Sequence, residues 1–204
     1  MPRVLLFSLF GYLCGSILFA RLFSKLFHKD ILTPSPDQNP GVANAFMYGG
    51  FWCGFCTLLG DVLKGFLPVF LLTTGAPLQS LGLPYALALA APVLGHAFPV
   101  FNRFRGGKGI AATFGCLLGL FPCSPLPFAI FAAAFIFFSV VLKISPHFYR
   151  TIFAYLATAV LLPVLGAPGA VCGAFLIMAA TVCVRLHLSH EERERMTVKL
   201  AWMR

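Results

Sequence analysis

The stretch that decides the fold is residues 46–75, which read FMYGGFWCGFCTLLGDVLKGFLPVFLLTTG. It is longer than the roughly 20 residues that cross a bilayer as a single helix. Glycines gather in its first half, at Gly49, Gly50, Gly54 and Gly60. Irregular backbone at membrane depth is tolerated only where protein surrounds it. We therefore expect a broken start followed by a helix that continues through Pro68.

The rest of the chain has the same apolar character. Of its 204 residues, 59% are hydrophobic and 10% are charged, and the mean hydropathy is +0.90, which excludes a soluble globular domain. Further apolar runs cover roughly 4–24, 82–101, 109–121, 127–142, 150–165 and 168–186. We predict an all-α, polytopic membrane bundle of about seven transmembrane segments, forming one domain over residues 1–204.

The positive charges divide the links between these runs into two kinds. Links 76–81, 122–126 and 166–167 carry no charge, whereas 13 of the 15 Lys and Arg lie in or beside the alternate links and the tail. The positive-inside rule then predicts an outer amino terminus and a cytoplasmic carboxyl terminus. Because the cations lie between apolar segments, the net charge of +9 favours lipid headgroups or phosphorylated substrates over nucleic acid.

Residues 96–113, HAFPVFNRFRGGKGIAAT, combine cations with glycines at the start of an apolar run. Glycine lets backbone N–H groups close around an anion, and a helix start adds a favourable dipole. The segment is no nucleotide-binding Walker loop, since Asn102 and Gly109 break that pattern. It predicts a phosphate site whose candidate residues are His96, Arg103, Arg105, Gly106, Gly107, Lys108 and Gly109; a basic loop that only sets topology is the alternative.

Two further polar clusters fall on the same predicted side of the membrane. Residues 35–44 are rich in turn formers, and Asn39, Gly41 and Asn44 could present amides and carbonyls to a ligand. Asp61 and Lys64 share one helix face inside an apolar run, where ionisable residues are costly and indicate function by default. A plain loop and a structural ion pair remain the respective alternatives.

Little else in the sequence suggests chemistry. Cys53 and Cys56 have the spacing of a zinc or redox pair, but no second pair accompanies them, so we predict neither a metal nor a cofactor. In the tail, Ser189 and Glu192 form a capping-box pattern, and Met196, Leu200 and Met203 follow at helical spacing. We expect a short amphipathic surface helix there, from whose start His190 could reach a phosphate.

These residues together resemble the bacterial, integral membrane family of acyl-phosphate-dependent glycerol-3-phosphate acyltransferases. That family carries the motifs G-S-G-N-x-G-A-T-N-x-x-R, D-x-x-K-G, H-x-F-P-x-F…GGKG-x-A-T and H-R-x-N-I, in this order. Residues 96–113 match the third motif closely, and Asp61, Lys64 and Gly65 match the second. The resemblance runs over most of the chain.

The first and last motifs depart from the family pattern. Asn39, Gly41 and Asn44 are kept, but Asp37, Ala43 and Met47 replace a serine, a threonine and an arginine. Near His190, which matches the last motif's histidine, Arg193 replaces an asparagine. In the family these serine, arginine and asparagine positions help to hold the phosphate of glycerol 3-phosphate. An aspartate here should repel a phosphate dianion, unless Arg193 compensates.

The resemblance implies transfer of an acyl group from acyl phosphate to glycerol 3-phosphate, giving lysophosphatidic acid at the cytoplasmic face of the cell membrane. Lys108 and the amides of the glycine loop would bind phosphate, with Arg103 and Arg105 assisting. His96 would orient the site, and the Asn39–Asn44 loop with His190 would position the acceptor. Two alternatives stay open: a divergent enzyme with another hydroxyl acceptor, and a non-catalytic protein that binds or transports phosphorylated lipid or small anions.

Overall fold

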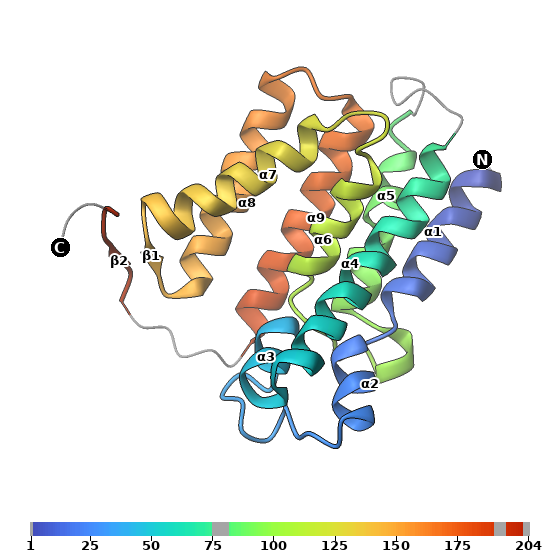
Figure 1. The fold of residues 1–204 in the computed structure, drawn as a ribbon. Helices are drawn as coiled ribbons and strands as arrows, with labels where there is room; N and C mark the ends of the chain where they lie inside the picture. The colour runs from blue at the N-terminus through green and yellow to red at the C-terminus, as the bar shows by residue number, and fades with distance from the viewer. Residues whose placement is uncertain (1, 75–81, 190–194, 202–204) are drawn as a thin grey trace.

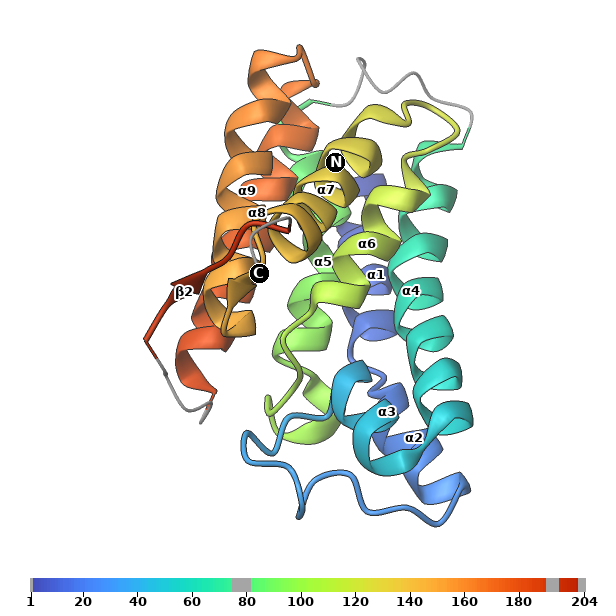
Figure 2. The same cartoon turned by 60° about the vertical axis from the view of Figure 1, so that its left-hand side comes forward.

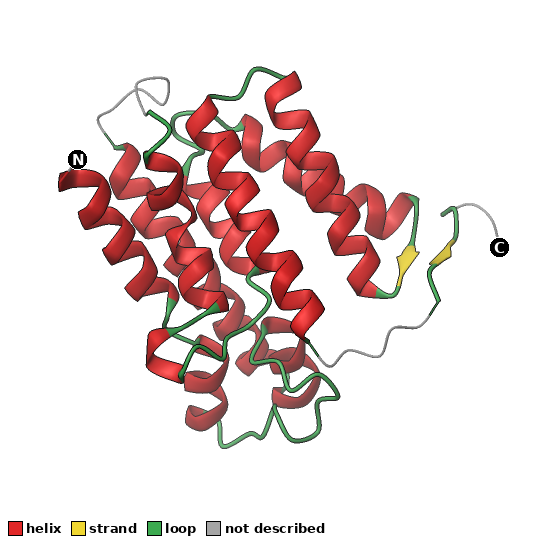
Figure 3. Ribbon diagram, turned by 180° about the vertical axis from the view of Figure 1, so that it is seen from behind, coloured by secondary structure: helices red, strands yellow, loops and turns green. Residues whose placement is uncertain are grey.

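The computed structural model describes residues 2–74, 82–189 and 195–201. Helices dominate these residues, and two short strands lie to one side (Figures 1 and 3). The helices are α1 (Pro2–Gly15), α2 (Phe19–Leu26), α3 (Val42–Gly49), α4 (Phe51–Thr73), α5 (Tyr85–Ala97), α6 (Ile110–Gly119), α7 (Leu126–Ile136), α8 (His147–Val164) and α9 (Gly169–Leu188). A 3-10 turn covers Val100–Asn102, a π-helical turn covers Phe137–Val141, and β1 (Ile144–Ser145) pairs antiparallel with β2 (Thr197–Val198).

The apolar sequence accounts for the membrane-like character of the bundle. Among the described residues, five helical segments are long and apolar enough to span a bilayer: Pro2–Leu26, Phe51–Thr73, Tyr85–Asn102, His147–Val164 and Gly169–Leu188. The predicted helical membrane fold is confirmed. The count of seven crossings stays a prediction, because α6, about 15 Å long at 1.5 Å per residue, is shorter than a hydrocarbon core of about 30 Å. The orientation of the termini also stays a prediction.

The helices approach one another closely where small residues face across the interface. In α4 and α6, a side chain on Gly65 would overlap the Ala112 carbonyl oxygen, and one on Gly115 would overlap the Val62 carbonyl oxygen. Small residues of this kind let membrane helices pack backbone to backbone. The other extensive contacts join α1 to α5 and α5 to α9, so these five helices form the body of the bundle (Figure 2).

The predicted break in the second apolar run is confirmed at Gly50. This residue separates α3 from α4 with a φ of 85°, a backbone conformation that favours glycine. The helix α4 then continues through Pro68, as the sequence predicts. The consequence is that α3, with Asn44 on it, lies beside α2 at the end of the bundle where the loop of residues 27–41 also lies (Figures 1 and 2).

The first apolar run differs from the single helix that its composition favours, because it breaks between Gly15 and Phe19. Gly15 lies against the Pro92 carbonyl oxygen, where a Cβ would overlap it. The Ile17 carbonyl oxygen accepts a hydrogen bond of 2.6 Å from Lys64 Nζ, which replaces the helical partner that the break removes. An ionisable residue of α4 therefore stabilises the bend between α1 and α2.

The amphipathic tail helix expected from the sequence is wrong for the part that the structure describes. Thr197 and Val198 form strand β2 instead, and the Ala201 amide donates to the Val141 carbonyl oxygen. Backbone pairing with β1 competes here with the local preference for a helix. Residues 190–194 and Met203 lie outside the described residues.

Candidate active site

The polar loop of residues 35–44 is organised around one carboxylate. Asp37 Oδ1 accepts hydrogen bonds from Ser35 Oγ at 2.7 Å, from Asn44 Nδ2 at 2.8 Å and from the Asn39 amide at 3.2 Å. Asn44 is buried near the start of α3, and its Nδ2 also lies 2.8 Å from the Asn39 carbonyl oxygen. The loop thus gathers donors around a side chain that is itself negatively charged.

The second carboxylate oxygen joins this loop to the glycine-rich segment. Lys108 Nζ lies 3.0 Å from Asp37 Oδ2, and both side chains are about nine-tenths buried. Burial alone would raise the pKa of Asp37, but hydrogen bonds from Ser35 and Asn44 and the charge of Lys108 outweigh it and hold that pKa well below its usual range. Asp37 is therefore ionised at neutral pH, and the sequence-predicted phosphate lysine already has an anionic partner.

The glycine-rich segment is pressed against His96. The Gly107 amide donates to the His96 carbonyl oxygen at 3.1 Å, and side chains on Gly106 or Gly107 would overlap His96 itself. Gly109 has a φ of 90° and precedes the first residue of α6. Glycine is required at these positions, because only a chain without Cβ atoms lies this close to the imidazole and turns this sharply into a helix.

Arg185, near the end of α9, also holds the glycine-rich segment. Its guanidinium donates to the Gly106 carbonyl oxygen and lies 5.8 Å from the centre of the Phe98 ring. This residue is not among those that the sequence motifs predict for the site. A cation inside an apolar run was the available signal, because such residues usually face a protein interior or a polar cavity.

The two loops enclose a cavity of about 480 Å³, a size typical of small-molecule sites. Four cationic side chains and one carboxylate line it, so its surface is strongly positive. Its lining residues are Arg21, Leu32, Asp37, Gln38, Asn39, Pro40, Arg105, Gly106, Lys108, Arg185, Leu188 and Ser189. We call this space the anion cavity below, because its charge and its N–H groups suit a phosphate.

The structure thus brings together the predicted residues Asn39, Arg105, Gly106 and Lys108. Asn44, Gly107 and Gly109 support the two loops from behind. Gly41 precedes the first residue of α3, and Arg103 is exposed; neither lines the anion cavity. His190 and Arg193 lie outside the described residues.

Asp61, Lys64 and His96 form a second polar cluster, which is separate from the lining of the anion cavity. Lys64 Nζ lies 2.7 Å from Asp61 Oδ1, and His96 Nδ1 lies 3.7 Å from the same oxygen. All three side chains are almost completely buried. Lys64 stabilises the bend at Ile17, and His96 lies against the glycine segment. The predicted contact of these three residues with a substrate or the reacting groups stays a prediction.

The fold and the two loops define a polytopic helical membrane protein with a cationic cavity at one end of the bundle. The family model for glycerol-3-phosphate acyltransferase matches residues 5–197. The chain belongs to this family, so the resemblance given by its motifs is confirmed.

Curated relatives agree with this assignment. A glycerol-3-phosphate acyltransferase of Cupriavidus taiwanensis is 42% identical over 119 residues, which cover 58% of this chain and 59% of the relative. One from Pseudomonas aeruginosa is 41% identical over 132 residues, covering 64% and 66%. The matched segment thus spans less than two thirds of either relative.

Two solved structures of one protein share the fold of this chain over most of the length of both proteins. They are crystal structures of PlsY (YgiH), an integral membrane glycerol 3-phosphate acyltransferase. Its glycerol 3-phosphate form superposes with a TM-score of 0.74 at 28% identity, covering 89% of this chain and 87% of that one. Its lysophosphatidic acid form gives a TM-score of 0.71 at 27% identity, with the same coverage.

Proposed function

We propose that this protein transfers a fatty acyl group from acyl phosphate to a hydroxyl of glycerol 3-phosphate. The hydroxyl oxygen attacks the acyl carbonyl carbon and forms the ester bond. The bond from that carbon to the phosphate oxygen breaks, and inorganic phosphate leaves with the hydroxyl proton. The other product is lysophosphatidic acid.

The observation that carries this proposal is the positive lining of the anion cavity. Both substrates bear phosphate, and Arg21, Arg105, Lys108 and Arg185 border one space of about 480 Å³. Charge-assisted hydrogen bonds from such groups bind phosphate and stabilise charge that develops in the transition state. Family membership and the two ligand forms of the structural relative support glycerol 3-phosphate as the acceptor and lysophosphatidic acid as the product.

Each residue then has a stated role in the proposal. Lys108 binds the phosphate of the acyl phosphate together with the amides of the glycine segment other than that of Gly107, which is bonded to His96, and Arg105 assists. Asn39 positions the acceptor, together with His190, and Arg103 steers anions from the surface. Asp37 is a weak proton acceptor because its pKa is lowered, so the departing phosphate is the better base. His96 holds the glycine segment in place through its carbonyl oxygen.

The test uses purified protein in lipid nanodiscs with acyl phosphate and glycerol 3-phosphate, measuring phosphate release. Wild-type protein should release phosphate only when the acceptor is present. Lys108→Ala should lower the rate about 10²-fold, the typical cost of removing one group that stabilises developing charge. Lys143→Ala, an exposed cation outside the anion cavity, is the matched control and should leave the rate unchanged. Unchanged turnover in Lys108→Ala contradicts the proposal.

A second candidate function is acyl transfer to a hydroxyl acceptor without phosphate. The ion pair between Asp37 and Lys108 favours it, because the carboxylate occupies donors that a phosphate would use. A panel of alcohols, with and without phosphate, separates the two candidates by their kcat/KM values. Tight binding of acyl phosphate without phosphate release for any acceptor would favour the non-catalytic alternative instead.

We also propose that the anion cavity opens to the cytoplasm. The basis is the distribution of cations, which places 13 of 15 Lys and Arg on one predicted side. In inverted membrane vesicles, a membrane-impermeant thiol reagent should label Gln38→Cys in a variant lacking the native cysteines. Labelling only in right-side-out vesicles would reverse the orientation.

A further inference from the structure

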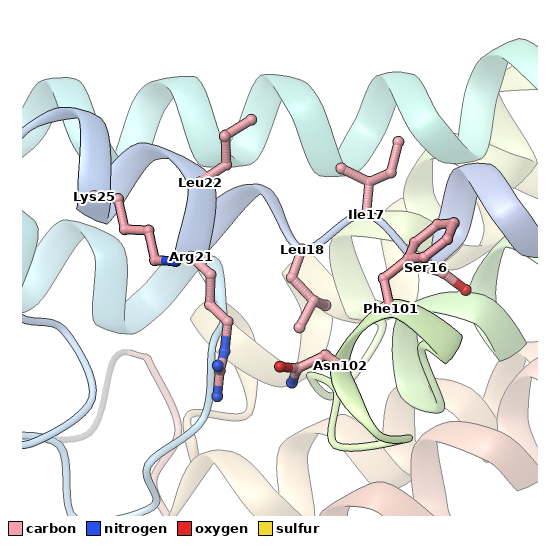
Figure 4. Close-up of a pocket in the computed structure, with 8 residues that line it drawn as sticks. All are labelled: Ser16, Ile17, Leu18, Arg21, Leu22, Lys25, Phe101 and Asn102. Carbon is pink, nitrogen blue, oxygen red and sulfur yellow. The ribbon is translucent and has the colours of Figure 1, made fainter.

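A second cavity lies where α1 ends and α2 begins, against the 3-10 turn that follows α5. Its volume is about 320 Å³. Figure 4 shows its lining side chains, which are Ser16, Ile17, Leu18, Arg21, Leu22, Lys25, Phe101 and Asn102. We call it the junction cavity; it shares only Arg21 with the anion cavity.

The charged side chains of this cavity have no acidic counterpart. Arg21 and Lys25 are four residues apart on α2, so their like charges lie close together and repel. Within the described part of the chain, neither forms an ion pair, and Arg21 Nε is buried without a hydrogen-bond partner. In Figure 4 the Arg21 side chain extends from α2 toward the Asn102 amide. A bound anion would relieve the repulsion and supply the missing acceptor.

The rim of the junction cavity is apolar and exposed. Ile17, Leu22 and Phe101 are 42%, 51% and 67% exposed. Lys25, Phe101 and Asn102 of this cavity lie at the ends of two candidate spans, Pro2–Leu26 and Tyr85–Asn102, where lipid headgroups are expected. Cations beside exposed apolar side chains at this depth match a molecule with an anionic head and hydrocarbon tails.

We propose that the junction cavity binds the headgroup of an anionic membrane phospholipid. The phosphate lies between Arg21 and Lys25, beside Asn102, and the acyl chains run along Ile17, Leu22 and Phe101. This site adjoins the substrate site, with which it shares Arg21, and its occupancy does not depend on the proposed reaction. Because Arg21 borders both cavities, a bound headgroup also fixes the position of one cation of the anion cavity.

Native mass spectrometry of the detergent-solubilised protein tests the proposal by titration with phosphatidylglycerol and, separately, phosphatidylcholine of the same chain length. Wild-type protein should bind phosphatidylglycerol about tenfold more tightly. Lys25→Gln should lower that preference about fivefold, the contribution of one basic residue at an anionic lipid surface. Lys25 is exposed and lies outside the anion cavity, so this variant should fold normally and keep its substrate site.

Lys143→Gln is the matched control, since it removes an exposed lysine that lines neither cavity. An equal loss in both variants means general attraction to charge and overturns the proposal, as does equal affinity of the wild type for the two lipids. Displacement of phosphatidylglycerol by millimolar inorganic phosphate also overturns it, because the cavity would then be a site for small anions. Retention of lipid under that competition supports the lipid site.

Discussion

Among the residues that the structure describes, two ion pairs between aspartate and lysine have similar distances but different surroundings. Asp61 and Lys64, at 2.7 Å, lie on one helix and are almost completely buried in the bundle. Asp37 and Lys108, at 3.0 Å, come from two separate loops and line the anion cavity. The buried pair stabilises a bend of the backbone, whereas the pair in the cavity joins two loops at the proposed substrate site. The same chemistry therefore has a structural task in one region and a proposed role in binding in the other.

Breaking the buried pair should have the largest effect. Asp61→Asn leaves the Lys64 ammonium buried without a counter-charge, which costs about 3 to 5 kcal/mol in folding free energy. The midpoint of thermal unfolding in detergent should fall by many degrees. The double variant Asp61→Leu with Lys64→Met should recover most of this loss, although the Ile17 carbonyl oxygen then lacks its donor. An unchanged midpoint in Asp61→Asn would show that the pair is not structural.

Removing the carboxylate from the cavity should have an intermediate effect, and the quantity that changes is the binding of the acceptor. Asp37→Ser removes the carboxylate that pairs with Lys108 and keeps a hydroxyl in the loop. We expect the KM for glycerol 3-phosphate to fall about tenfold, equivalent to about 1.4 kcal/mol. Gln38→Asn, an uncharged change in the same lining, should move KM less than twofold. An equal gain for acceptors without phosphate would show that the carboxylate does not select against phosphate.

The dependence of stability on pH should show the smallest effect. The folded-state pKa of Asp37 lies below its ordinary value of about 3.9, so the unfolded chain takes up the proton first as the pH falls. The stability that the pair contributes is therefore complete at neutral pH and is lost below about pH 4. With allowance for partial solvent screening, it amounts to about 1 kcal/mol. Wild-type protein should unfold at a higher temperature than Asp37→Asn at pH 7, and this advantage should shrink steadily as the pH falls below about 4; an advantage that grows on acidification would contradict the assignment.

The two regions also differ in how far the sequence predicts them. Asp61 and Lys64 are three residues apart, so their pairing follows from helix geometry alone. The partner of Lys64 at Ile17 is 47 residues away, and for that reason the bend between α1 and α2 was not predicted. In contrast, Gly49 and Gly50 indicated the break before α4 correctly, because glycine acts locally.

For the anion cavity, the sequence identified four of the twelve lining residues, Asn39, Arg105, Gly106 and Lys108, but not their arrangement. The motifs pointed to Asn39, Arg105 and Lys108, and the comparison with the family identified Asp37 as a departure. That Asp37 contacts Lys108 depends on how two distant loops fold together, which no spacing encodes. Arg21 and Arg185 were missed as site residues because they belong to no motif, and only their place at the end of a span brings them to the cavity.

The wall of the anion cavity draws on residues from both ends of the chain, from Arg21 on α2 to Ser189 just after α9. During synthesis on the ribosome, a chain stopped before α9 lacks Arg185, Leu188 and Ser189, and the glycine segment lacks its tether at the Gly106 carbonyl oxygen. The newly made polypeptide therefore acquires a closed site only once its last long helix has been inserted. Partially translated chains would be inert toward phosphorylated metabolites.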